Sequence, residues 1–295
     1  MTALSIVHLV DASPYIFRAH FSLPSSIRDP GGAPAAATYG FAGFLLKLLA
    51  DERPTHLAVA FDRHLNSSFR NRVFPAYKQQ RALPPPELEA QIATCEEVAA
   101  ALGAATFIDE LYEADDLIAT VWEQVGKKAT GAVVVTSDKD LAQLVDARVS
   151  LYDFGKGERY GEREVFAKFG VRPDQVTDLL GLAGDPVDNI PGVKGIGRKT
   201  AAEILAVFDH VEDLYACLDE VRKGKLRGAK SLYAKLAAAR DLALLSKQLA
   251  TVAADAPLRV SLDDLAYRGA DPAKVEPLFE RLGFKTIKDR IPAWR

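Results

Sequence analysis

Three short apolar segments of the chain each lead into aspartates, and this pattern constrains the fold more than any other feature of the sequence. The segments cover residues 5–10, 56–61 and 131–136, and the acids that follow are Asp11, Asp62, and Asp138 with Asp140. Segments of this length, rich in β-branched residues and without polar alternation, are typical of parallel strands buried on both faces. Helical patterns over residues 39–50 and 88–102 separate them. We therefore predict an α/β fold with a central, mostly parallel sheet flanked by helices.

The position of these acids predicts a shared site. A single aspartate after a strand is common, because Asp is a frequent turn residue. Acids after three parallel strands are a stronger signal, since ligands of such sheets bind in the crevice outside the carboxyl ends of the strands. We expect the three groups of acids to converge there.

Two further acidic clusters extend the set. Glu113, Asp115 and Asp116 open an apolar helical segment, where favourable interaction with the helix dipole is the alternative explanation. Asp185 and Asp188 stand three residues apart and would share one face if their segment is helical. Carboxylates gathered in one crevice repel one another, and hard divalent cations relieve that repulsion. Because the set contains no Cys or His, it favours magnesium or manganese over zinc.

The distribution of basic residues is compatible with a polyanionic ligand. The net charge is −3, from 37 Lys and Arg against 40 Asp and Glu. Two runs contain basic residues and no acid, namely 63–86 (Arg63, Arg70, Arg72, Lys78, Arg81) and 221–235 (Arg222, Lys223, Lys225, Arg227, Lys230, Lys235). One such run is often a solvated surface, whereas two together favour a phosphate-rich ligand.

A glycine-rich stretch over residues 192–200 resembles a phosphate-binding P-loop at first sight. Gly192 and Gly197 have the P-loop separation, but Arg198 occupies the lysine position and no strand precedes the stretch. A helix-hairpin-helix turn is the better interpretation, since its glycines let a phosphate approach the backbone and the next helix begins at the anion. Lys194, Arg198 and Lys199 add charge, and such contacts bind the duplex backbone irrespective of sequence.

The cysteine count, the apolar runs and the order of sequence patterns limit the possible sites, location and domain organisation of the protein. Cys95 and Cys217 are the only cysteines, which excludes a disulfide framework and a thiolate zinc site. The chain contains no run of 18 apolar residues and does not begin like a signal peptide, so we expect a cytoplasmic protein with no membrane partner. Helical patterns dominate beyond about residue 170, and the last segment is rich in proline. We divide the chain into an α/β domain (1–170), a helical domain (171–255) and a tail packed on the body (256–295).

Several motifs together carry a resemblance to a known family. They are Val10–Arg18, Ala60–Asp62, Phe69–Arg70, Tyr77–Arg81, Tyr112–Asp116, Thr136–Asp140 and Gly184–Thr200. In this order they resemble the 5′ nucleases, which include the 5′→3′ exonuclease domain of bacterial DNA polymerase I, phage 5′ nucleases and flap endonucleases. One departure is Ala12, where relatives commonly have glycine. Because no polymerase domain follows, the chain resembles a free-standing bacterial member.

The resemblance implies a metal-dependent, structure-selective nuclease that acts on DNA as a 5′→3′ exonuclease and 5′-flap endonuclease. It implies two Mg²⁺ ions, with Mn²⁺ as a substitute, one bound by Asp62, Glu113, Asp115, Asp116 and, through water, Asp11. The second ion would be bound by Asp138, Asp140, Asp185 and Asp188. A helical arch around residues 78–105 would pass the single-stranded 5′ end, and a helix-three-turn-helix over the glycine stretch would bind the duplex.

The family also implies roles for individual residues. Lys78 and Arg81 would contact the scissile phosphate and stabilise its transition-state charge, although a solvated basic turn is the alternative. The expected DNA contacts are Phe17, Arg18, Arg70, Tyr77, Gly192, Lys194, Gly195, Gly197, Arg198 and Lys199. Phe17 and Tyr77 would stack on unpaired bases, or else belong to the core. The backbone carbonyls of Val193 and Ile196 would bind a potassium ion.

Two other functions remain open at this point. One is a catalytically silent DNA-junction binding protein, and the other is a PIN-like ribonuclease built on a similar acidic two-metal site. For partners we expect DNA with 5′ flaps or 5′ ends and DNA replication and repair proteins, with the protein acting as a monomer.

Overall fold

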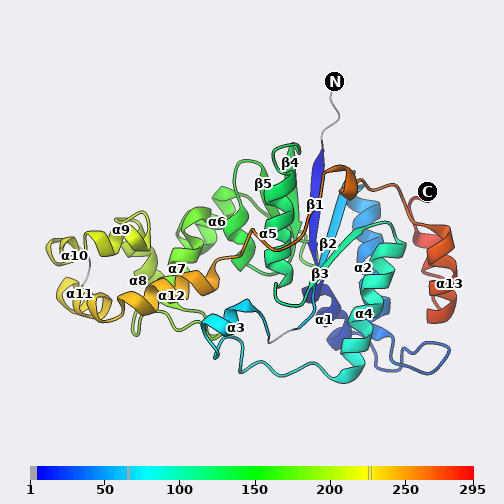
Figure 1. Ribbon diagram of the computed structural model, residues 1–295, viewed down its shortest axis with the longest axis horizontal. Helices are drawn as coiled ribbons and strands as arrows, with labels where there is room; N and C mark the ends of the chain where they lie inside the picture. The colour runs from blue at the N-terminus through cyan, green and yellow to red at the C-terminus, as the bar shows by residue number, and fades with distance from the viewer. Residues whose placement is uncertain (1–4, 65–66, 225, 227) are drawn as a thin grey trace.

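The computed structural model describes residues 5–64, 67–224, 226 and 228–295 (Figure 1). Within these residues one six-stranded sheet has the order β3-β2-β1-β4-β5-β6. Its strands are β1 (Ile6–Asp11), β2 (His56–Asp62), β3 (Ala105–Asp109), β4 (Gly131–Val135), β5 (Val149–Asp153) and β6 (Glu158–Tyr160). Neighbouring strands are parallel except for β6, which runs antiparallel to β5. The predicted α/β fold with a mostly parallel sheet is confirmed.

Helices cover both faces of this sheet, and the strands explain why. Val10, Val59 and Phe61 point into a core formed with α1 (Ser13–Ser22), α2 (Ala36–Glu52) and α4 (Pro86–Ala101). Val7, Leu9 and Ala58 point the other way, into a core formed with α5 (Ala114–Val125) and the helices beyond it. Successive strand side chains alternate between faces, so an uninterrupted apolar strand supplies two cores at once.

The second half of the chain is helical, as its sequence pattern predicts. Its helices are α6 (Glu162–Phe169), α7 (Val176–Ala183), α8 (Arg198–Leu205), α9 (Val211–Ala216), α10 (Asp219–Lys223), α11 (Ala229–Ala238) and α12 (Arg240–Ala250). They extend away from the sheet on one side, and α7 packs against α8 and α12 (Figure 1). The basic run predicted over residues 221–235 lies on α10 and α11, with Lys225 and Arg227 outside the described residues.

Shorter elements complete the fold. Helix α3 (Phe69–Val73) lies below the sheet edge, and four 3-10 helices are described, η1 (Asp140–Leu144), η2 (Pro173–Gln175), η3 (Asp263–Leu265) and η4 (Lys288–Arg290). The final segment returns across the sheet, where the Tyr267 N–H donates to the Thr55 carbonyl. It ends with α13 (Pro272–Leu282) packed against α4.

Part of the predicted arch belongs to the core. Leu88, Cys95 and Val98 of α4 are fully buried, so this helix is held between α2 and α13. The exposed part of the segment is the stretch from residue 79 to residue 87, which joins the basic turn to α4. In the described part of the chain, no helix is long and apolar enough to cross a membrane.

Candidate active site

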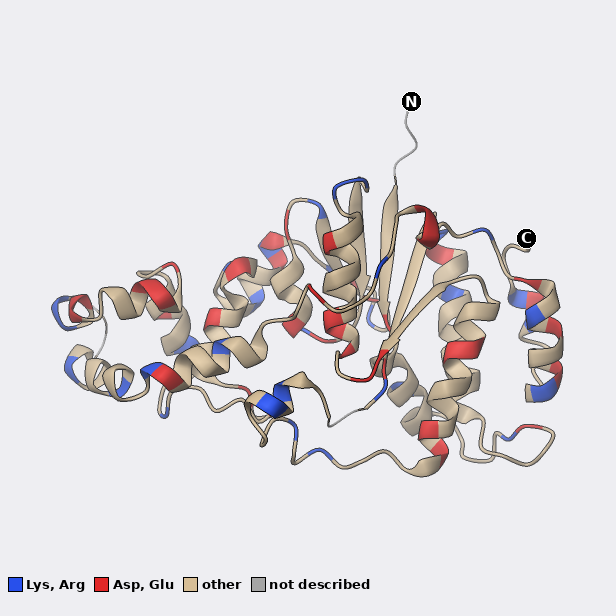
Figure 2. Ribbon diagram, viewed as in Figure 1, with Lys and Arg blue, Asp and Glu red and all other residues tan. Residues whose placement is uncertain are grey.

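Acidic residues gather where the strands end, beside the first turn of α5 (Figure 2). Asp11 and Asp62 are the last residues of β1 and β2. The Asp11 carboxylate accepts hydrogen bonds from the Thr136 hydroxyl at 2.8 Å and the Ser13 N–H at 3.2 Å. The Ser13 hydroxyl in turn donates to Asp62 at 2.5 Å. Sequence reasoning missed Ser13 and Thr136, although each hydroxyl stands two residues from an acid of the set.

The acidic run before α5 joins these strand ends. Glu113 is the N-cap of the helix, and the Ala114 N–H donates to Asp62 at 2.8 Å. This contact brings Asp115 beside the carboxylates of the sheet. Burial and the neighbouring charges of Asp11 and Asp138 raise the pKa of Asp115 well above its usual range.

Asp138 and Asp140 form the next part of the site, in the turn after β4. The Asp138 N–H donates to the Thr136 hydroxyl at 2.9 Å, and Asp138 accepts from the Asp140 N–H at 2.9 Å. Burial and the charges of Asp138, Asp185 and Asp188 raise the pKa of Asp140 to about 7. Burial and the nearby Asp62 similarly raise the pKa of Asp11 well above its usual range.

The acids whose pKa values are raised, and neighbouring acids whose charges raise them, lie at one edge of the sheet. We call seven of these acids the carboxylate cluster: Asp11, Asp62, Asp115, Asp138, Asp140, Asp185 and Asp188. The structure therefore brings together acids that are up to 177 positions apart in the sequence, from Asp11 to Asp188. Burial, reinforced by their mutual repulsion, raises the pKa values of Asp11, Asp62, Asp115 and Asp140 above the usual range.

The turn that carries Asp185 and Asp188 differs from the sequence expectation. It is a tight loop rather than a helix, closed by paired backbone hydrogen bonds between Asp185 and Ile190 at 2.9 and 2.8 Å. Gly184 and Gly192 meet at its base, where a Cβ on Gly192 would lie 2.2 Å from the Gly184 nitrogen. Gly192 is buried and its N–H donates to the Ser246 hydroxyl at 3.0 Å. Its predicted DNA contact is therefore wrong, because the loop closure occupies it.

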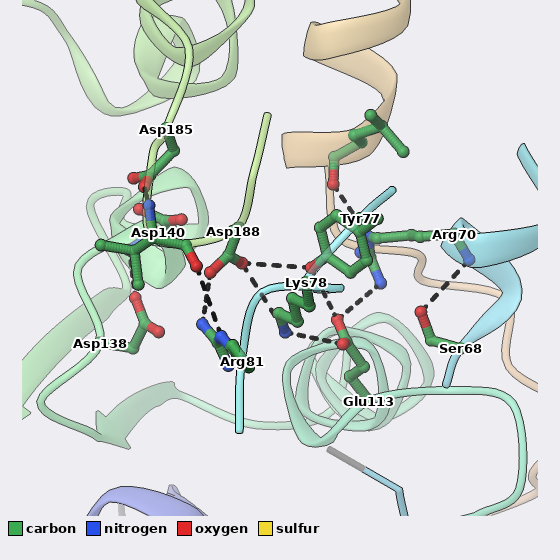
Figure 3. Close-up of polar contacts among 12 residues, drawn as sticks. Ser68, Arg70, Tyr77, Lys78, Arg81, Glu113, Asp138, Asp140, Asp185 and Asp188 are labelled. Carbon is green, nitrogen blue, oxygen red and sulfur yellow. Dashed lines mark hydrogen bonds and ion pairs between the residues drawn. The ribbon is translucent and has the colours of Figure 1, made fainter. Parts of the chain in front are cut away.

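Lys78 and Arg81 face the carboxylate cluster, as Figure 3 shows. The Lys78 ammonium lies 2.7 Å from Glu113 and 3.7 Å from Asp188, and Arg81 forms an ion pair with Asp188. The Lys78 backbone is strained, with φ of 53°, and its N–H donates to the Asp188 carbonyl at 3.0 Å. Burial opposes ionisation of Glu113, but the charges of Lys78 and Arg70 outweigh it and lower the Glu113 pKa.

Arg70 and Asp116 have structural roles that the sequence prediction did not give them. Arg70 is 3% exposed and forms a double hydrogen bond with Asp116 at 2.8 and 2.7 Å. It also donates to Glu113 and to the carbonyls of Leu249 and Thr251. This burial and full pairing leave Arg70 unable to contact DNA, contrary to the prediction.

Asp116 is likewise fully paired, and its role as a metal ligand stays a prediction. Besides the two bonds from Arg70, its oxygens accept from the N–H groups of Glu113 at 3.0 Å and Ala253 at 2.7 Å. Both carboxylate oxygens are thus occupied, and the side chain is fully buried. Arg70 and Asp116 together fasten the start of α5 to the end of α12.

The two aromatic residues predicted to stack on bases lie in different surroundings. Tyr77 is 3% exposed, and its hydroxyl donates to Glu113 at 3.1 Å and to Asp188 at 3.2 Å. This burial fits the alternative that Tyr77 belongs to the core, and its hydroxyl orients the two acids. Phe17 is half-buried on α1, with its ring 6.4 Å from that of Phe21. Arg18 is exposed on the same helix.

The glycine-rich stretch joins α7 to α8 as a hairpin. Lys194, Gly195, Gly197, Arg198 and Lys199 are exposed, whereas Val193 and Ile196 are buried. The Ile196 N–H donates to the Val193 carbonyl at 3.0 Å, and Lys235 of α11 donates to the Gly195 carbonyl at 3.1 Å. Arg198 lies 3.4 Å from Asp185, so this hairpin reaches the carboxylate cluster.

The donor chemistry of the cluster fits hard divalent cations. Its members offer only carboxylate oxygens, which is the ligand type that Mg²⁺ and Mn²⁺ prefer. No three acids, histidines or cysteines of the described residues are already arranged as a closed ligand set. Repulsion between the acids and the ion pairs of Asp185 and Asp188 with basic residues account for that open arrangement.

Comparisons with known proteins agree with this geometry. The chain matches the family models "5′-3′ exonuclease, N-terminal resolvase-like domain" over residues 6–170 and "5′-3′ exonuclease, C-terminal SAM fold" over residues 171–273. DNA polymerase I of Bacillus caldotenax is 41% identical over 96% of this chain and 32% of its own length. DNA polymerase I of Bacillus subtilis is 40% identical over 99% of this chain and 33% of its own length. The chain thus spans about a third of these relatives.

Solved structures share the fold. A zinc-bound T5 5′-exonuclease superposes with a TM-score of 0.68 at 23% identity, covering 94% of this chain and 99% of that one. The catalytic core of Rad2 in complex with a DNA substrate gives a TM-score of 0.61 at 15% identity, covering 97% and 90%. The two family models together account for most of the chain, and they confirm the resemblance that its motifs carry. The chain belongs to the 5′-3′ exonuclease family.

Proposed function

We propose that this protein is a metal-dependent, structure-selective 5′ nuclease, acting as a 5′→3′ exonuclease on DNA ends and an endonuclease on 5′ flaps. The observation that carries the proposal is the carboxylate cluster with Lys78 and Arg81 directly opposite it. Family membership supports the same reaction class.

The cluster, together with Glu113, provides two groups of candidate ligands for two Mg²⁺ ions. Asp62, Glu113 and Asp115, with Asp11 through water, would hold one ion, and Asp138, Asp140, Asp185 and Asp188 would hold the other. A metal pair in such a site lowers the pKa of an attacking water and stabilises the leaving oxygen. A structure of T5 D15 protein co-crystallised with metal ions supports divalent metal binding by a protein of this fold.

Lys78 and Arg81 would neutralise the scissile phosphate. In the DNA-free structure their charges are paired with Glu113 and Asp188. A phosphate entering between the basic turn and the cluster would compete for these cations, and the burial of Lys78 strengthens its interaction. The ordered ion pairs hold both side chains at the site before the substrate arrives.

DNA binding completes the proposal. Lys194, Gly195, Gly197, Arg198 and Lys199 would contact the duplex backbone, and the exposed 79–87 stretch would guide the single-stranded 5′ end past the cluster. Phe17 and Arg18 of α1 would also contact the substrate. We also propose a K⁺ ion at the backbone carbonyls of Val193 and Ile196. The Val193 carbonyl accepts one hydrogen bond, from the Ile196 N–H, and keeps a second lone pair for the ion.

For the cellular setting we propose a monomeric enzyme of the cytoplasm that works beside DNA replication and repair proteins. The relatives named DNA polymerase I support an action on DNA. The enzyme's substrates would be duplex–single-strand junctions with free 5′ ends.

A cleavage assay on a 5′-flap DNA with labelled ends tests the proposal. We expect cleavage near the junction with Mg²⁺, none with EDTA, and none by D140N, while the exposed-site control D255N cleaves normally. A matched RNA flap separates a DNA nuclease from a PIN-like ribonuclease. Tight junction binding without cleavage in any divalent metal would instead identify a silent binding protein and overturn the proposal.

A further inference from the structure

A basic pocket lies beside the carboxylate cluster, between the loop after β4, helix α6 and helix α8. Its volume is about 520 Å³, and its lining includes Lys139, Lys168, Arg198 and Lys199, with Glu203 as the one acid. Sequence analysis singled out Arg198 and Lys199 on α8, but the two lysines on the opposite wall have no assigned role.

The placement of the two lysines on that wall is specific. Lys139 lies between Asp138 and Asp140, so it brings a positive charge to the rim of the cluster. Lys168 stands in the last turn of α6, where its ammonium donates to the Tyr160 hydroxyl at 2.9 Å and lies 4.2 Å from the Tyr160 ring centroid. Tyr160 therefore fixes the direction of Lys168 without neutralising its charge.

The charges of the pocket are available to an anion. Among the residues that the structure describes, no carboxylate forms an ion pair with Lys139, Lys168 or Lys199, and Arg198 reaches Asp185 only at 3.4 Å. Helix α8 begins at Gly197 without a side-chain cap, so its first-turn amides add partial positive charge on the same side. Like charges from three separate elements repel one another, and an anion between them relieves that repulsion.

We propose that this pocket binds a backbone phosphate of duplex DNA next to the catalytic cluster, with Lys139 and Lys168 as DNA-positioning residues. The proposal rests on the proposed nuclease function. The pocket clamps the duplex between the α/β body and α8, which fixes the distance between the bound duplex and the carboxylates. A phosphate contact of this kind reads no sequence.

Lys168 gives the cleaner test, because Lys139 is too close to candidate metal ligands. We expect K168A to weaken binding of a 5′-flap DNA in Ca²⁺ roughly fivefold, the effect of losing one exposed charge pair. The slope of log Kd against log salt concentration should fall by about one, as for one lost phosphate contact. K168R should restore both values. R163A removes an exposed charge from the same helix and should behave as wild type.

The outcomes separate this proposal from the proposed function. If the wild type cleaves the flap and K168A keeps the wild-type Kd and salt slope, the pocket does not bind phosphate. If the wild type neither binds nor cleaves the flap, the nuclease proposal itself fails. Single-turnover cleavage by K168A at saturating protein should be slower than by the wild type, because the bound duplex loses a contact that fixes its distance from the carboxylates, and an unchanged rate there would contradict a positioning role. Melting temperatures of the variants confirm that each is folded at the assay temperature.

Discussion

Replacing Arg70 by methionine tests the structural role that the buried network gives this residue. The change removes a buried cation that donates to Asp116, Glu113 and two backbone carbonyls at the end of α12. Asp116 keeps the N–H groups of Glu113 and Ala253 but loses its counter-charge in a fully buried position. Breaking a buried ion pair by removing one partner costs about 3–5 kcal/mol.

For a protein of this size each kcal/mol lowers the melting temperature by about 2–4 °C, so we expect R70M to melt roughly 6–20 °C below the wild type. Arg72 provides the matched control, because it is exposed on the same short helix, and R72M should change the free energy of unfolding by less than about 0.5 kcal/mol. Thermal unfolding followed by circular dichroism, with DNA affinity measured well below the transition, distinguishes a structural role of Arg70 from a DNA contact. An R70M protein with wild-type stability and greatly reduced DNA affinity would refute the structural role and restore the predicted DNA contact.

Other predictions follow from the same site. D115N should abolish flap cleavage and leave flap binding in EDTA intact, which gel-shift and cleavage assays measure on the same substrate; normal cleavage by D115N would exclude this acid from the metal site. K78A should lower the single-turnover rate at least about tenfold, the scale of losing one transition-state electrostatic contact, and an unchanged rate would exclude Lys78 from the reaction. Because the pKa of Asp140 is raised to about 7 in the folded protein, the metal-free fold binds a proton that the unfolded chain has already released above pH 4. Stability should therefore fall as the pH rises from about 4 to about 7 and level off above it, and Mg²⁺ should raise the melting temperature more at pH 8 than at pH 6; an equal rise at both would contradict this coupling.

The central strands could be predicted because strands that are buried on both faces appear in the sequence as short apolar runs. β1, β2 and β4 lie inside the sheet and are mostly apolar and buried, so the acids at or just after their ends were found as well. β3 and β6 lie at the two edges and β5 next to the edge, with mixed burial, and β6 has only three residues. None of these strands is a continuous buried apolar run, although β5 alternates between buried and half-buried residues over its five positions, and none of the three was predicted.

The candidate site was predictable as a set of acids but not in its internal division of roles. Within the run from Glu113 to Asp116, spacing alone cannot show that Asp116 turns towards Arg70 while Asp115 faces the cluster. The separation of Asp185 and Asp188 fits one helical turn, yet the close contact of Gly184 and Gly192 closes the segment as a loop. Tyr77 and Arg70 have the residue types of DNA contacts, and only tertiary packing shows that both are buried.

The arrangement of the basic residues was predictable only in part. The glycine hairpin and its cations carry a local signal, and most of them are exposed as expected. Lys139 and Lys168 belong to two different elements that meet only in the folded chain. Neither stands in a basic run, and therefore no local pattern marked them.

Anomalous diffraction from crystals of the protein with Mn²⁺ and a 5′-flap DNA tests the central claim most directly. We expect two manganese peaks about 4 Å apart, bound by carboxylates of the cluster on either side of a DNA phosphate, with Lys78 and Arg81 turned towards that phosphate. Manganese bound elsewhere, or DNA seated on a surface away from these carboxylates, would contradict the account.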